Sequence, residues 1–285
     1  MKPWLAFGAC GAIWGSTFLV ISIGNDALAP VWAATLRLAL AAALLAAWTR
    51  ARGQRLPRGP ALRAALGYGI GQFGVNLPLL YWGEKLVPSG VSAVLYATIP
   101  FSSAVAARAL GVERLTPAKV AGALVAFGGV AVLFSASLNR HIPAAGFAAI
   151  LAGATAASVG TALLKRGPRQ DPFAANAVGC AAGAILAAVA SFALGEAHTF
   201  PGTARAAWPL LYLTVAGSLG AYVILAWLLA HWPVTRTSYI TVIVPVIALA
   251  LGAVVRHEPL VPGSLAGTAL ILGGLLLGMR PARPR

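Results

Sequence analysis

Long apolar runs, separated by short polar breaks, make up nearly the whole chain. An α-helix needs about 20 mostly apolar residues to cross the hydrocarbon core of a bilayer, and runs of this kind occur ten times. They cover residues 4–23, 30–48, 61–82, 88–110, 117–135, 144–164, 172–195, 206–230, 234–255 and 262–279. Prolines stand at or just before most of the starts, where a helix tolerates a missing N–H. The pattern predicts an all-α polytopic membrane protein with ten transmembrane helices.

The composition supports a lipid-facing surface. Hydrophobic residues make up 59% and charged residues 9% of the 285 positions, and the mean hydropathy is +0.84. Soluble domains carry about 25% charged residues. A net charge of +15 would favour a nucleic-acid partner in another chain. Here the basic residues lie between the apolar runs and form no groove or stripe, so we expect a lipid bilayer around the protein and no nucleic acid.

Lysines and arginines are divided unevenly between alternate loops. With the N-terminus in the cytoplasm, 15 of the 21 lie on the cytoplasmic side, and two more, Arg37 and Arg236, fall within runs. The four on the opposite side are Lys85, Arg140, Arg205 and Arg256. Cytoplasmic loops of membrane proteins carry such an excess, and an odd number of helices would scramble it. We therefore expect both termini in the cytoplasm.

The chain repeats itself at an offset of 145 residues. Pro88, Pro100, Glu113, Leu115, Pro117, Gly122 and Gly129 recur as Pro233, Pro245, Glu258, Leu260, Pro262, Gly267 and Gly274. Each half holds five predicted helices, an odd number, so the second half enters the membrane from the opposite side. We predict two inverted repeats, residues 1–140 and 141–285, an arrangement typical of secondary transporters.

Several short motifs resemble one transporter family. Trp14-Gly15-Ser16-Thr17-Phe18 lies in the first run, and Leu36-Arg37 lies in the second. The stretch from Gly111 to Pro117, with Gly122 and Gly128-Gly129, has a second copy in His257-Glu258-Pro259-Leu260, Gly267 and Gly273-Gly274. In order and spacing these motifs resemble the EamA family of the drug/metabolite transporter superfamily, and the resemblance covers essentially the whole chain.

The resemblance implies a central cavity lined mainly by runs 1, 3, 4, 6, 8 and 9, and transport by alternating access. Family members mostly export amino acids, other metabolites or drugs from the bacterial cytoplasm, which places the chain in the inner membrane. The aromatic amino-acid exporters are the preferred branch, with aromatic and neutral amino acids as substrates. Drugs, nucleosides and sugars are the alternatives.

Polar side chains recur at helical spacing on the runs that the resemblance places around the cavity. They are Ser16, Gln72, Asn76, Ser92, Tyr96, Ser158, Thr161, Ser218, Tyr222 and Thr241. The repeat pairs Ser16 with Thr161 and Tyr96 with Thr241, so we expect the stripes to converge near one axis. Uncharged hydroxyls and amides beside aromatic walls suit a small zwitterionic or neutral ligand. The alternative for each hydroxyl is interhelical hydrogen bonding.

Arg37 is a charge inside an apolar run, which costs about 3 kcal/mol on insertion scales and is a functional candidate for that reason. It is predicted either to anchor a substrate carboxylate or to fix the bundle by hydrogen bonds. The structural role is favoured because the resembling family has this arginine whatever its substrate. Trp14 completes the candidate substrate-binding set.

Three prolines fall inside runs and free backbone carbonyls, which kinks a helix. Pro100 and Pro245 stand at matching repeat positions, and Pro78 interrupts the third run. They are predicted as hinges of the two gates, or else as static kinks.

Carboxylates are expected at the membrane boundaries and not deep in any run. Glu84, Glu113 and Glu258 each stand beside a basic residue at the end of a run, which favours ion pairs or helix caps. This argues against proton antiport through a membrane-embedded glutamate and leaves the driving force open.

Other function classes lack the residues they need. Asp26 and Asp171 are too far apart for the paired aspartates of a Mg²⁺-dependent prenyl-transfer enzyme, and no HExxH, P-loop or dinucleotide motif is present. Rings of charge or filter-like loops, which a channel needs, are not visible. We expect a carrier that is not an enzyme, with a small-molecule substrate, no metal and no cofactor, as a monomer or homodimer.

Overall fold

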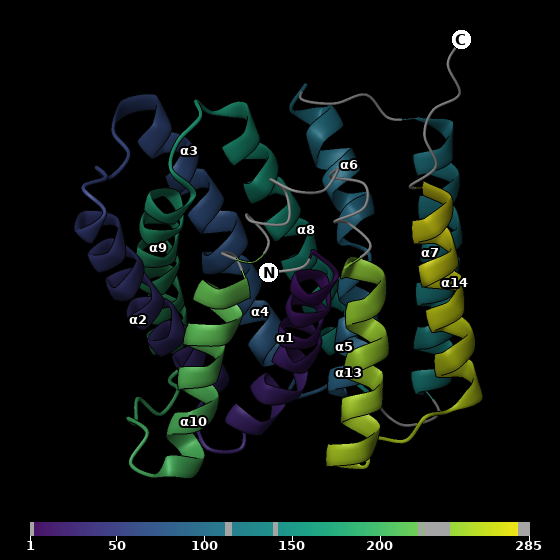
Figure 1. Cartoon of the computed structure of the whole chain (residues 1–285). Helices are drawn as coiled ribbons and strands as arrows, with labels where there is room; N and C mark the ends of the chain where they lie inside the picture. Colours follow the sequence, from purple (N-terminus) through teal and green to yellow (C-terminus); the bar gives the residue numbers. More distant parts are fainter. Residues whose placement is uncertain (1–2, 112–115, 139–141, 222–223, 225–239, 279–285) are drawn as a thin grey trace.

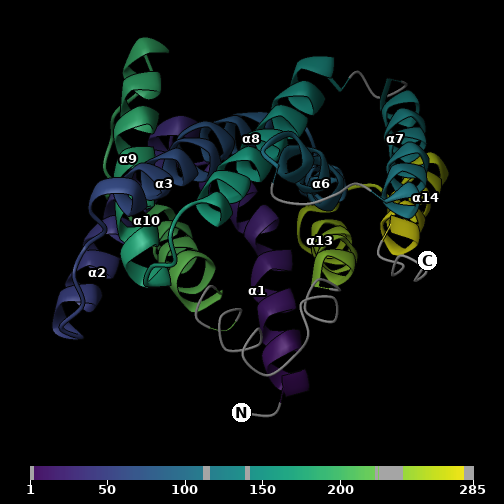
Figure 2. The ribbon, with the colours of Figure 1, turned by 90° about the horizontal axis from the view of Figure 1, so that it is seen from above.

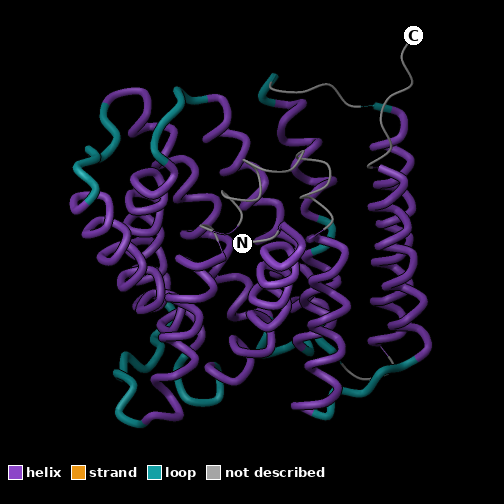
Figure 3. The backbone as a smooth tube through the Cα atoms, viewed as in Figure 1, coloured by secondary structure: helices purple, strands orange, loops and turns teal. Residues whose placement is uncertain are grey.

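Helices form the regular structure throughout the described part of the chain (Figures 1 and 3). The computed structural model describes residues 3–111, 116–138, 142–221, 224 and 240–278. The runs that form single helices are α1 (Pro3–Gly24), α2 (Pro30–Ala51), α7 (Pro117–Leu138), α8 (Ala144–Arg166), α9 (Pro172–Ala193) and α14 (Pro262–Gly278), and the described part of the ninth run is α13 (Ile240–Arg256). By length and hydropathy, α1, α2, α8, α9 and the stretch Ser89–Ala106 are each long enough to cross a bilayer. The all-α membrane fold is confirmed.

Three predicted runs are built from shorter pieces. The third contains α3 (Gly59–Gly69), the π-helix η1 (Ile70–Val75) and α4 (Asn76–Gly83), and the fourth contains α5 (Ser89–Tyr96) and α6 (Ile99–Ala109). The eighth contains α10 (Ala204–Tyr212) and a second π-helix, η2 (Leu213–Gly220). The N–H of Asn76 bonds the carbonyl of Gly71 and that of Ala221 bonds the carbonyl of Ala216, five residues back in each case. Such π-helical insertions are rare and frequently mark functional sites.

Prolines account for two of the breaks. Pro100 has no N–H to donate to the carbonyl of Tyr96, so α5 ends at Tyr96 and α6 begins at Ile99. Pro78 likewise cannot bond the carbonyl of Gly74, which lies within η1. At the matching position of the second repeat, α13 continues through Pro245 without a break. The two repeats therefore differ at this pair of prolines.

The α7–α14 pair shows how the repeats are related. A Cβ on Gly122, near the start of α7, would lie 2.7 Å from the N of Gly278 near the end of α14, and one on Gly129 would lie 2.8 Å from the carbonyl oxygen of Gly267. Gly122 also faces Gly274. An offset of 145 residues exchanges the contacts Gly122–Gly274 and Gly129–Gly267, and the two helices run antiparallel. The pair therefore packs about a pseudo-two-fold axis, as inverted repeats require.

The other spans lie between this pair and a second one, α2 with α9, at the opposite edge of the bundle (Figure 2). Between them, α1 packs on α13 and α8 packs on α6. The offset of 145 residues carries the first of these contacts onto the second. The main core joins side chains of both halves, including Phe18, Leu38, Phe73, Val94 and Ile150. This packing brings the third, fourth and eighth spans to the middle of the molecule.

Candidate functional site

The third and fourth spans meet at a hydrogen-bonded pair beside η1. Tyr96, the last residue of α5, donates its hydroxyl to Oδ1 of Asn76 at 2.6 Å, and Nδ2 of Asn76 donates to the carbonyl of Gln72 at 3.1 Å. Asn76 is fully buried, whereas Tyr96 and Gln72 are half-buried. The Phe18 ring packs edge-on against Tyr96 at 5.5 Å between centroids. Asn76 therefore orients the Tyr96 hydroxyl, and Tyr96 and Gln72 are the accessible members.

Helix α8 closes the other side of this group. The hydroxyl of Thr161 lies 3.5 Å from Oε1 of Gln72. Ser158 is buried, donates to the carbonyl of Ala154 at 2.9 Å, and has the hydroxyls of Ser102 and Ser103 at 3.1 Å. Ser158 thus joins α8 to α6, which is the packing role that serine commonly has in membranes.

Arg37 lies beside η2. Its Nε donates to Oγ of Ser218 at 3.1 Å, and Nη1 donates to the hydroxyl of Tyr81 at 3.3 Å. Ser218 in turn donates to the carbonyl of Leu213. The arginine is 6% exposed, and it forms no ion pair with a carboxylate in the described part of the chain. These contacts tie α2 to α4 and η2, which supports the structural role.

A second tyrosine stands next to η2. The hydroxyl of Tyr212, the last residue of α10, lies 2.6 Å from Oγ of Ser16, which also lies 2.9 Å from the carbonyl of Ile13. Because Ser16 has one proton to donate and Ile13 can only accept, the arrangement has Tyr212 donating to Ser16. Both side chains are half-buried.

The remaining candidates lie farther from these groups or outside the described part. Ser92 is fully buried and donates to the carbonyl of Pro88 within its own helix. Trp14 is half-buried and packs against a small core that includes Phe7 and Cys10. Tyr222 and the side chain of Thr241 are not among the described residues.

Seven of the predicted residues thus lie in two groups, one at each π-helix: Gln72, Asn76, Tyr96 and Thr161 at η1, and Ser16, Arg37 and Ser218 at η2. Sequence reasoning missed Tyr81 and Tyr212. A search for polar residues at spacings of three or four passes over Tyr212, because η2 lies between it and Ser218 and changes the number of residues per turn. Tyr81 lies on the face of α4 turned toward α2, five residues after Asn76, and its bond to Arg37 has no signature in local sequence.

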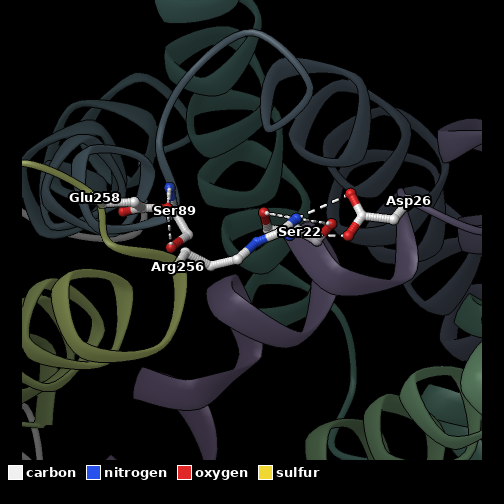
Figure 4. A network of polar contacts seen from close by, with 5 residues as sticks. All are labelled: Ser22, Asp26, Ser89, Arg256 and Glu258. Atoms are coloured by element: carbon white, nitrogen blue, oxygen red, sulfur yellow. Dashed lines mark hydrogen bonds and ion pairs between the residues drawn. The ribbon is translucent and has the colours of Figure 1, made fainter.

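The carboxylates at one end of the bundle only partly follow expectation. Glu258 caps a helix, as predicted, but the helix is α5 of the other repeat (Figure 4): it accepts from the N–H and hydroxyl of Ser89 at 2.8 and 2.7 Å. Arg256 donates to both carboxylate oxygens of Asp26 and to Ser22 (Figure 4). Glu84, in contrast, is 6% exposed, and neither of its oxygens has a hydrogen-bond partner in the part of the chain that the structure describes. Glu113 lies outside the described residues.

The fold and the site together define a class of protein. Two repeats are related by a pseudo-two-fold axis, each has a π-helix in its third span, and uncharged polar groups lie beside both π-helices. Discontinuous helices of inverted repeats hold the substrate sites of secondary transporters. The described residues contain no cluster of three metal-ligating side chains. The molecule is a membrane transporter.

The chain belongs to the EamA-like transporter family, whose model matches residues 2–135 and again residues 144–280. It is 32% identical to a probable amino-acid metabolite efflux pump of Salmonella typhimurium, with 96% of this chain and 93% of that protein covered. It is 30% identical to a probable terminal-alkyne amino-acid exporter of Streptantibioticus cattleyicolor, with 93% and 89% covered. A crystal structure with 23% identity shares the fold at a TM-score of 0.67, covering 97% and 96% of the two chains. The resemblance found in the motifs is confirmed.

Proposed function

We propose that the protein exports small metabolites, above all aromatic and neutral amino acids, across the bacterial inner membrane. Transport proceeds by alternating access between the two repeats. The names of the two relatives support amino-acid export as the activity of this group. The geometry supports a ligand without strong net charge.

One observation carries the substrate class. Each π-helix has beside it a half-buried tyrosine whose hydroxyl is held by an uncharged partner, Tyr96 by Asn76 and Tyr212 by Ser16. The described members of both groups include no carboxylate, so neither group favours a cation. Hydroxyls and amides bind both the ammonium and the carboxylate of a zwitterion, and the Phe18–Tyr96 ring pair provides an apolar wall. A neutral or aromatic amino acid meets both requirements.

Counterflow in proteoliposomes tests the proposal. Vesicles are preloaded with unlabelled phenylalanine, tryptophan, threonine or alanine, and the labelled amino acid is supplied outside. We expect saturable accumulation of label that collapses without the preload, because a carrier exchanges its substrate across the membrane and a channel does not. The absence of exchange by folded, monodisperse protein would contradict amino-acid transport and move the proposal to drugs, nucleosides or sugars.

The charge pattern supports a topology with both termini in the cytoplasm. Single cysteines replacing Gln54 and Arg283 should react with an impermeant reagent only from the cytoplasmic side, and a cysteine replacing Gly202 only from outside. The buried native thiols, Cys10 and Cys180, are replaced by alanine. Labelling of position 54 or 283 from outside would contradict the topology.

A further inference from the structure

A carboxyl group that has no partner in the described structure lies buried at the end of the bundle that the charge pattern predicts to be outside (the outer end, at the bottom of Figure 1). Glu84 directly follows the last residue of α4 and is 6% exposed, and among the described residues neither of its oxygens has a hydrogen-bond partner. Oδ1 of Asn25 is also buried and has no partner within the described ranges, while Nδ2 of Asn25 donates to the carbonyl of Tyr81 at 2.9 Å. Burying an ionised carboxylate without hydrogen bonds is strongly unfavourable.

Glu258 is a nearby carboxylate in the opposite situation. It accepts from the N–H and hydroxyl of Ser89 and from the N–H of Gly90 at 3.1 Å, all at the start of α5. Backbone donors and the positive end of a helix stabilise an anion there. Gly252 leaves room for this contact, because a Cβ at that position would collide with the Glu258 carboxylate. Glu258 is therefore the charged member of the two.

The other charged groups around Glu84 do not neutralise it. Arg37 is directed to Tyr81 and Ser218, Arg256 is paired with Asp26, and Lys85 is exposed. Glu84 also follows the C-terminal end of α4, where the helix dipole disfavours an anion. Burial raises the pKa of Glu84 well above its usual range, and the negative charge of Glu258 raises it further. Two carboxyls with such different surroundings separate into one charged and one neutral group.

We propose that Glu84 is a proton-binding site that controls closure of the outer end. The carboxyl is neutral while Glu258 and Arg256 of the second repeat hold the first repeat at Ser89, Gly90 and Asp26, and it releases its proton when this end opens to water. A metal cation fits this site less well, because hard cations take six or more oxygen ligands. The described residues offer only three unpartnered oxygens here, two from Glu84 and one from Asn25.

The sign of the pH dependence follows from the burial. The pKa of Glu84 is higher in the closed state than in the open state. Protonation therefore favours closure fully at pH values below the open-state pKa, and this contribution is lost as the pH rises through the closed-state pKa. Between the two values the ratio of closed to open molecules falls tenfold per pH unit, because one proton is released on opening. Alkaline conditions outside therefore open this end.

Distance measurement between two spin labels tests the proposal. Labels replace Ala27 in the first repeat and Leu260 in the second, both exposed at the outer end, after Cys10 and Cys180 are changed to alanine. In wild type we expect a short distance at low pH and a growing long-distance population as pH rises. Glu84→Gln, which mimics the protonated carboxyl, should keep the short distance at every pH.

Glu196→Gln is the matched control, because Glu196 caps α2 from the second repeat at the same end and its loss should leave the pH response intact. The proposal is overturned if wild type shows no response, if Glu84→Gln keeps it, or if the response follows Na⁺ at fixed pH. As a measurement independent of the variant's folding, wild type at neutral pH should show the infrared band of a protonated carboxyl; its absence overturns the proposal. Neither measurement uses a substrate, so both stand apart from the counterflow result.

Discussion

The two π-helices occupy equivalent positions in the two repeats but are held by different neighbours. An offset of 145 residues carries η1 onto residues 215–220, within η2. Around η1 two of the contacts are between backbones: a Cβ on Gly71 would lie 2.9 Å from Gly160, and one on Gly183 would lie 3.2 Å from the N of Gly74, which also packs against the side chain of Leu186. Around η2 the close neighbours of Gly217 are side chains, Arg37 and Thr17.

This difference shows which parts of the structure are free to change. Backbone surfaces in direct contact tolerate little movement, because interiors are packed as densely as crystals. Side-chain hydrogen bonds are individually weak and exchange for others. We therefore expect the third span of the first repeat to move with α8 as one body, and η2 to rearrange against α1 and α2 during transport.

The largest effect is expected from breaking the η1 contact. Gly160→Leu places a side chain where even a Cβ would lie 2.9 Å from the N of Gln72 and from the carbonyl of Tyr68. Overpacking of this kind costs about 3 kcal/mol, so the melting temperature and the folded yield should both fall. Gly128→Leu is the control, because no described atom lies within 4 Å of a Cβ there. Equal stability of the two variants would contradict the rigid contact.

A smaller loss is expected when Arg37 is removed from η2. Arg37→Leu leaves the hydroxyl of Tyr81, which is 1% exposed, without its donor, at a cost of about 2 kcal/mol in unfolding free energy. Arg37→Lys should lie between wild type and the leucine variant, since one ammonium cannot reproduce the two directed bonds. If instead stability is unchanged and the Michaelis constant for amino acids rises in both variants, Arg37 binds the substrate carboxylate.

The hydrogen bonds of Tyr96 and Tyr212 allow the two π-helices to be compared by their effect on transport. Asn76→Ala and Tyr96→Phe should each reduce counterflow about fivefold, the effect of roughly 1 kcal/mol, with unchanged folded yield. The double variant should be no worse than either single one, because both remove the same hydrogen bond. The loss of counterflow in Tyr212→Phe should add to the loss in either of these variants, because Tyr212 bonds Ser16 in the other group. Wild-type flux in Asn76→Ala and Tyr96→Phe would remove this pair from the site.

The smallest effect concerns the prolines. Pro100→Ala restores a donor for the carbonyl of Tyr96 and allows α5 and α6 to join, so the maximal counterflow rate should fall about threefold, equivalent to roughly 0.7 kcal/mol on an activation barrier. Pro245→Ala should have less effect, because α13 is already continuous. A larger loss in Pro245→Ala would show that the break before Pro100 is not the hinge.

Hydropathy and repeat spacing were sufficient to predict the helical runs and the relation between the halves. They did not predict η1 or η2, because a π-helix depends on what packs against it and not on a local residue pattern. Of the site, helical spacing placed Gln72 and Asn76 on one face of the third span, and the expected convergence of the polar stripes added Tyr96 of the fourth. Sequence did not predict that Glu84 lacks a hydrogen-bond partner among the described residues, since this depends on which residues from three distant segments pack around it. The division of the domains at residue 140 stays a prediction.

The glycine contacts between α7 and α14 are symmetric about the pseudo-two-fold axis. Exchanging the two repeats returns the same pair of contacts, which is the property of an interface between two identical subunits. The contact therefore has the form of a homodimer interface whose two copies, inserted in opposite directions, now lie on one chain. In a homodimer one substitution alters both contacts at once. In the fused chain Gly122 and Gly267 are separate positions, so the two sides of the axis can diverge, and a transporter built this way is free to give its two gates different chemistry.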